Sequence, residues 1–302
     1  MGERVEEEVF NASTSDGAKL ALRRLRGRGA ASHPVLLSHG TFSNGRVCLK
    51  LANFLREQGF DCWVLDWRGH GLSDKAAAGV SYEELALRDV EAALQCVQEQ
   101  TGEESLFWVG HSAGGILPLI YLAHHPEQGA RFRGIVTLAS QTTDAGRHLG
   151  AKLKLGLGYV AVNALRKAPA AVFRLGPEDE SLRLMNQWFR WNLSGDWVGA
   201  GGFDYFKELG RVRAPALCLA GAGDTFIAPV RGCRRVFEAL GSTDKTFLYC
   251  GRAEGFQQDY SHGSIIAGSA AREDVWPRVS RWLEERSAPG ARSAPEVRSD
   301  VA

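Results

Sequence analysis

Short apolar runs alternate along this chain with longer segments in which apolar residues recur every three or four positions. The first pattern is typical of buried strands, and it covers residues 35–38, 62–65, 106–109, 135–139, 215–220 and 246–250. The second is typical of amphipathic helices, and it covers residues 49–58, 82–100, 229–240 and 269–285. Strands that alternate with helices predict an α/β fold, with a mostly parallel, doubly wound sheet and helices on both faces.

Two segments depart from this alternation. Near the N-terminus, Asp16-Gly17 separates two runs of mixed polarity, which predicts a β-hairpin. Residues 141–213 are helical in places and unusually aromatic, and five of their apolar residues share one helical face: Leu153, Leu157, Val160, Ala164 and Leu165. We therefore expect a core built from residues 1–140 and 214–286, an inserted helical cap over 141–213, and a disordered tail over 287–302.

Composition excludes several classes of partner. The 302 residues, 44% apolar and 24% charged, can bury the core of one large domain. A net charge of +1 provides no field that would gather nucleic acid, and no apolar run is long enough to cross a bilayer. Because the first residues are acidic, a signal peptide is not expected and we predict a cytoplasmic protein. The six cysteines have no C-x-x-C spacing, so free, buried thiols are expected.

One apolar run stops abruptly at a serine between glycines, in Gly110-His111-Ser112-Ala113-Gly114. Residues 106–109 before it predict a strand and residues 116–123 after it a helix, with Pro118 in the first helical turns. A G-x-S-x-G sequence between strand and helix predicts a tight turn that exposes the serine oxygen. The helix that begins at Ala113 points free N–H groups towards that oxygen. A glycine-rich turn without chemistry has about the same probability on the motif alone.

A serine nucleophile needs a histidine base and an acid that orients the histidine, and in this fold class they follow in the order serine, acid, histidine. Asp224 follows the predicted strand 215–220, and His262 lies between the last predicted strand and the last predicted helix. Asp204 and Asp259 are rival acids, but the first lies in the insertion and the second on the same loop as His262. Ser112, Asp224 and His262 are thus predicted at one edge of the sheet.

No metal site or cofactor is predicted, because no two histidines have H-x-x-x-H spacing near an acid. Three other histidines, His39, His70 and His111, lie close in sequence to the predicted site. We expect them to form hydrogen bonds with the backbone there.

From about residue 9 to 285 the chain resembles the α/β-hydrolase family of serine esterases and lipases. The resemblance rests on Asp224 and His262 and on three stretches: Ser38-His39-Gly40-Thr41, Asp66-Trp67-Arg68-Gly69-His70-Gly71-Leu72-Ser73 and Gly110-His111-Ser112-Ala113-Gly114. It implies an α/β-hydrolase fold, acyl chemistry at Ser112, and an oxyanion hole made by the N–H groups of Thr41 and Ala113.

The expected reaction is hydrolysis of a small carboxylic ester through an acyl-enzyme. The aromatic residues of the insertion suggest an apolar acyl or alcohol group, although packing within the cap explains them equally well. A thioesterase, an acyltransferase or a carbon–carbon bond hydrolase could use the same triad. A ligand receptor that retains the triad but turns over slowly is a further alternative, and the oligomeric state stays open.

Overall fold

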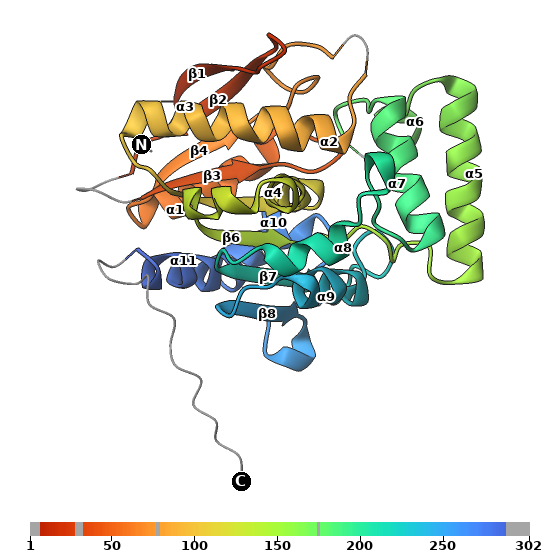
Figure 1. Cartoon of the computed structure of the whole chain (residues 1–302). Helices are drawn as coiled ribbons and strands as arrows, with labels where there is room; N and C mark the ends of the chain where they lie inside the picture. Colours follow the sequence, from red (N-terminus) through yellow and green to blue (C-terminus); the bar gives the residue numbers. More distant parts are fainter. Residues whose placement is uncertain (1–6, 28–32, 77–78, 174–175, 288–302) are drawn as a thin grey trace.

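The computed structural model describes residues 7–27, 33–76, 79–173 and 176–287 (Figure 1). These residues form an eight-stranded sheet with the order β1-β2-β4-β3-β5-β6-β7-β8. The strands are β1 (Glu7–Ser13), β2 (Lys19–Leu25), β3 (Pro34–Ser38), β4 (Asp61–Leu65), β5 (Leu106–His111), β6 (Phe132–Leu138), β7 (Ala216–Gly221) and β8 (Lys245–Cys250). Only the pairs that involve β2 are antiparallel in this sheet, so the predicted hairpin and the mostly parallel sheet are both confirmed.

The central strands are apolar along most of their length, as expected where helices cover both faces of the sheet. On β5, Leu106 and Trp108 belong to one apolar cluster, whereas Phe107 and Val109 belong to the other. The first cluster includes α3 (Glu91–Thr101) and α4 (Ala113–His124). The second includes α1 (Leu49–Glu57), α10 (Ser264–Ala267) and α11 (Val275–Glu285). Helix α9 (Val230–Ala239) packs against β7 and β8.

Two helices differ from their predicted form. The helix predicted over 82–100 begins at a capping box on Ser81 as α2 (Tyr82–Glu84) and continues through a π-helical turn, Leu85–Val90, into α3. The helix predicted over 269–285 starts late, at Val275, after a 3₁₀ turn over Ala270–Arg272. The carboxylate of Asp274, just before α11, accepts hydrogen bonds from the Gln257 N–H and the Tyr260 hydroxyl. This residue thus holds the preceding loop instead of extending the helix.

Helices α5 (Leu149–Leu165), α6 (Ala170–Phe173), α7 (Leu182–Ser194) and α8 (Tyr205–Glu208) lie between β6 and β7 in the chain. Figure 1 shows α5, α6 and α7 at one side of the molecule, with α5 outermost. Helix α5 packs against α7, whereas α8 packs against α4 and α9. The apolar face predicted on α5 is real, but it is exposed, and Leu155 and Val162 form the opposite, buried face.

All six cysteines are free and buried. Among the described residues, no helix has the length and apolar character that a membrane span needs. Of the tail predicted over 287–302, residues 288–302 lie outside the described part of the chain.

Candidate active site

Ser112 lies at a sharp turn between β5 and α4, with a left-handed φ of 55° and ψ of −124°. Non-glycine residues seldom adopt a positive φ, so this backbone is strained. The Ser112 N–H donates to the carbonyl of Leu138 on the neighbouring strand at 2.8 Å. A Cβ at position 110 would overlap the Gly114 backbone, and one at position 114 would overlap the His39 carbonyl oxygen. The two glycines of the motif are therefore required by close backbone contact.

Pro118 lies further inside α4 than predicted, at its sixth residue. Because proline has no N–H, the carbonyl of Gly114 lacks its usual helical donor. The indole Nε1 of Trp108 on β5 donates to that oxygen instead, at 2.8 Å. Trp108 is fully buried and thereby ties the strand before Ser112 to the first turn of the helix after it.

The structure brings Asp224 and His262 together. Asp224 follows β7, and its Oδ2 accepts a hydrogen bond from His262 Nδ1 at 2.6 Å. Its Oδ1 accepts from the N–H groups of Ile227 and Ala228 at 3.1 and 3.0 Å. Burial by itself raises the pKa of Asp224, but the His262 contact and these N–H groups outweigh burial and lower the pKa below its ordinary value. The carboxylate is therefore ionised and fixed in orientation.

The rival acids have other partners. Asp204 accepts from the Lys207 N–H at the start of α8, and Asp259 accepts from the Arg252 N–H at 2.9 Å. Within the described parts of the chain, no group of three or more metal-binding side chains occurs.

His111, the residue before Ser112, supports the loop that carries His262. Its Nε2 donates to the His262 carbonyl at 2.8 Å, and the two rings lie 4.7 Å apart between centroids. Burial lowers the pKa of His111 to about 3, so this ring is neutral. The predicted backbone contact of His111 is confirmed. Over the described residues, the Ser112 hydroxyl and the His262 ring form no direct hydrogen bond with each other, and contacts of this kind often tighten only when substrate binds.

The loop after β3 approaches Ser112 from the other side. A Cβ at Gly40 would lie 2.7 Å from the Ser112 Cβ, so only glycine allows this approach. His39 Nε2 accepts from the Trp67 N–H at 3.3 Å, and its Nδ1 therefore donates to the Gly40 carbonyl at 2.8 Å. Thr41 follows, with its hydroxyl 3.2 Å from that of Tyr82. The backbone contact predicted for His39 is thus confirmed.

The turn over Asp66–Ser73 is structural. Asp66 accepts hydrogen bonds from the N–H groups of Gly45 and Leu72 at 2.6 and 3.0 Å, and it pairs with Arg23 at 3.1 Å. Arg68 forms ion pairs with Asp16 and the buried Asp89. These contacts hold the turn beside the β3 loop, and they leave neither Asp66 nor Arg68 free for chemistry.

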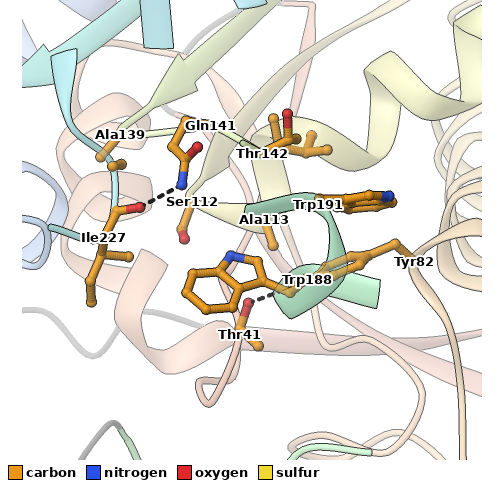
Figure 2. Close-up of a pocket in the computed structure, with 12 residues that line it drawn as sticks. Thr41, Tyr82, Ser112, Ala113, Ala139, Gln141, Thr142, Trp188, Trp191 and Ile227 are labelled. Atoms are coloured by element: carbon orange, nitrogen blue, oxygen red, sulfur yellow. Dashed lines mark hydrogen bonds between the residues drawn. The ribbon is translucent and has the colours of Figure 1, made fainter. Parts of the chain in front are cut away.

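A narrow cavity lies beside Ser112 (Figure 2). It measures about 320 Å³ including its open mouth. Tyr82 stacks on Trp191 of α7 with ring centroids 5.2 Å apart. The described lining residues carry no charge: Thr41, Tyr82, Ser112, Ala113, Ile116, Ala139, Gln141, Thr142, Trp188, Trp191, Ile227 and Ala228. Of the aromatic residues predicted in the insertion, Trp188 and Trp191 are thus the two that line it.

Residues 29–253 match the sequence family described as serine aminopeptidase, S33. The chain belongs to this family. Its sheet order and its solved relatives are those of the α/β-hydrolase fold, which confirms the predicted fold. A thermophilic esterase from Thermogutta terrifontis superposes with a TM-score of 0.62 at 19% identity, over 93% of this chain and 100% of the other. A monoacylglycerol lipase from Paleococcus ferrophilus gives 0.61 at 24% identity, over 93% and 100%.

Curated relatives of this S33 chain include human lipase member K, 28% identical over 45% of this chain and 39% of the relative. The PhaC subunit of the poly(3-hydroxyalkanoate) polymerase of Haloferax mediterranei is 21% identical over 82% of this chain and 56% of its own length. The chain therefore spans about two fifths to about half of the length of these relatives.

Proposed function

We propose that this α/β-hydrolase cleaves carboxylic esters, with Ser112 as nucleophile, His262 as base and Asp224 as the acid that orients the base. The observation that carries the proposal is the 2.6 Å hydrogen bond between His262 Nδ1 and the fixed Asp224 carboxylate. His111, the residue before Ser112, holds the loop that carries His262. We assign the described parts of residues 141–213 to a cap over this site, and those of residues 1–140 and 214–286 to the core.

The reaction follows from these positions. His262 Nε2 takes the Ser112 proton while the serine oxygen attacks the ester carbonyl, and the N–H groups of Thr41 and Ala113 stabilise the oxyanion. Collapse of this intermediate breaks the bond to the alcohol oxygen, which leaves with the proton from His262. Water then attacks the acyl-enzyme, with His262 again as base, and releases the carboxylic acid and free Ser112.

The lining of the cavity favours a neutral substrate. No carboxylate lines the described cavity, so the free ammonium group of an N-terminal peptide substrate would have no ionic partner there. Tyr82, Trp188 and Trp191 offer apolar surface, which supports an ester with a small apolar group. Esterase and lipase are also the activities in the names of several relatives.

Hydrolysis of a p-nitrophenyl ester series, from acetate to long-chain esters, tests the proposal. We expect Ser112→Ala to lose on the order of 10⁶-fold in kcat, and a fluorophosphonate to label Ser112. Ser140→Ala, which changes a buried serine just after β6, serves as the control and should stay within about tenfold of the parental kcat. Activity that persists in Ser112→Ala would contradict the proposal.

The same assay separates the alternatives. A faster reaction with an acyl thioester identifies a thioesterase, and transfer to an added alcohol identifies an acyltransferase. Cleavage of an aminoacyl p-nitroanilide in preference to every ester would instead establish peptidase activity. A single turnover followed by a stalled acyl-enzyme would indicate a receptor.

A further inference from the structure

The outermost helix of the cap, α5, presents an apolar stripe to solvent. Leu149, Leu153, Leu157 and Val160 recur at helical spacing and are 85, 64, 64 and 65% exposed. A soluble protein seldom exposes several large apolar residues side by side, and such a stripe commonly marks a surface that binds something. The opposite face of α5 is already occupied, because Tyr159 packs on Phe189 of α7 and Asn163 bonds with Asn186.

The positively charged residues around the stripe indicate which kind of surface it binds. Lys152 and Lys154 are both exposed, and because successive helical residues are rotated by about 100°, they lie on opposite sides of the stripe. Neither lysine forms an ion pair among the described residues. Arg147 and Arg166 lie near the two ends of α5, and residues 145–177 contain no aspartate or glutamate, although Lys167 pairs with Asp179 at 3.5 Å. An apolar stripe bordered by lysines matches a helix that lies in the plane of a membrane surface, with its lysines reaching lipid phosphates.

We propose that α5 docks this chain on an anionic lipid surface. The leucines enter the boundary between headgroups and acyl chains, and Lys152 and Lys154 contact the headgroups. Because α5 packs on α7, which carries Trp188 and Trp191, the docked face would adjoin the helix that lines the cavity. The proposal concerns binding and does not depend on the ester chemistry.

Flotation with phosphatidylcholine vesicles, with and without phosphatidylserine, tests this surface. We expect binding to vesicles with phosphatidylserine, weaker binding to those without it, and loss of binding at high salt. Lys152→Gln and Lys154→Gln should each weaken binding roughly fivefold, and Leu153→Ser with Leu157→Ser roughly 100-fold. Val9→Ser, which changes an apolar residue on β1 that is 50% exposed, should bind as the parent does.

Two results would overturn this proposal. In the first, the parent chain elutes as a dimer and does not bind vesicles, and Leu153→Ser with Leu157→Ser converts it to a monomer. The stripe would then be an interface between two copies of the chain. The other is binding that the leucine variants leave unchanged.

A second observation, independent of α5, concerns how the cap holds the loop that carries Thr41. Glu180 lies on the segment between α6 and α7 and is only 2% exposed. Its Oε1 accepts from the Phe42 N–H at 2.7 Å, and the Glu178 N–H donates to the Phe42 carbonyl at 3.2 Å. Phe42 has a left-handed φ of 61°. Both backbone groups of this strained residue, directly after Thr41, are therefore held by the cap.

His70 completes the arrangement. Its Nδ1 faces the Arg68 carbonyl and its Nε2 faces Glu180 Oε1, each at 3.1 Å. Both partners are acceptors, so both ring nitrogens must donate and His70 is an imidazolium paired with the Glu180 carboxylate. His70 thus contacts a cap side chain as well as the backbone group predicted for it.

We propose that Glu180 is a positioning residue, which sets the Thr41 N–H for the oxyanion through Phe42. This rests on the proposed function. Glu180→Ala should lower kcat by roughly 10- to 100-fold, less than the loss of an oxyanion donor itself, with KM nearly unchanged. Affinity for a trifluoromethyl ketone, which forms an oxyanion-like adduct, should fall in parallel. Glu180→Gln keeps an acceptor for Phe42 and should recover most of kcat.

The neighbouring Asp179→Ala is the control for damage to the segment and should leave kcat and ketone affinity unchanged. If Ser112→Ala is inactive while Glu180→Ala retains the parental kcat and ketone affinity, the positioning role is wrong and the proposed function stands. If Ser112→Ala is itself active, the proposed function fails first. Equal losses in Glu180→Ala and Glu180→Gln would also contradict the role of the acceptor oxygen.

Discussion

The two oxygens of Asp224 have different partners, and this difference makes Asp224→Asn a sharp test of the proposed triad. Oδ1 accepts two backbone N–H groups, from Ile227 and Ala228, whereas Oδ2 accepts from His262. An asparagine must place its carbonyl oxygen where Oδ1 is, because its NH₂ group cannot accept from the two N–H groups. Its NH₂ group therefore faces His262 Nδ1 and donates to it.

That donation forces the wrong tautomer. Nδ1 becomes the acceptor and the single proton moves to Nε2, so the ring can no longer take a proton from Ser112. The same substitution in the best-studied Ser-His-Asp triad lowers kcat about 10⁴-fold, which corresponds to about 5.4 kcal/mol in the activation free energy. We expect a loss of this size here, since the two N–H donors hold the amide in one orientation.

The measurement is kcat on the best p-nitrophenyl ester, at matched melting temperature, for Asp224→Asn and two controls. Asp259→Asn and Asp204→Asn keep an acceptor for their backbone donors, so each should stay within about tenfold of the parent. A near-parental Asp224→Asn, or the collapse of either control, would refute the assignment of the acid.

Three further predictions concern stability and specificity. The pKa of His70 is raised in the folded chain because Glu180 and its other partners outweigh burial, so its stabilisation is present at low pH and lost as pH rises through that pKa. The difference in unfolding free energy between the parent and His70→Gln, measured in urea, should therefore shrink from about pH 6 to about pH 9; a constant gap would contradict this. Trp188→Ala should enlarge the cavity and raise kcat/KM for hexanoate over acetate at least about tenfold, whereas equal changes for both esters would argue against it. Gly114→Ala should cost about 1–3 kcal/mol or more, and Gly129→Ala, which meets no atom within 4 Å, nearly nothing; similar melting temperatures would contradict the close contact.

The sequence was sufficient to predict the sheet because its central strands are buried on both faces and therefore read as unbroken apolar runs. The runs at 35–38 and 62–65 correspond almost residue for residue to β3 and β4. The start of α11 could not be predicted in this way, since the Asp274 carboxylate binds Gln257 and Tyr260 of the preceding loop as well as Arg278 of its own helix. The helical spacing in α5 was also visible, but periodicity does not say which side of a helix is buried. Here the stripe with more leucines faces solvent.

The pairing of Asp224 with His262 could be expected because chain order and strand ends are local properties of the sequence. The groups that support the site from distant parts of the chain could not be predicted in this way. Trp108 acts on a carbonyl that Pro118 leaves without a donor, a relation that appears only once strand and helix are packed. Glu180 lies 138 residues from the Phe42 N–H that it binds, in a segment with no motif. The sequence contained one indirect sign, the histidine in Gly69-His70-Gly71, whose partner it could not identify.

The burial of Glu180 explains why such a partner must exist. An unpaired carboxylate in a site that is only 2% exposed would be strongly destabilising, so the folded chain must provide a cation and an N–H donor there. His70 and Phe42 provide them, and both belong to the core, whereas Glu180 belongs to the segment between α6 and α7. Apolar surfaces tolerate small shifts, but a buried carboxylate that pairs with His70 at 3.1 Å and accepts from the Phe42 N–H at 2.7 Å has one favourable geometry. Polar contacts with the loop after β3, which approaches Ser112, thus fix the position of the cap segment that carries Glu180.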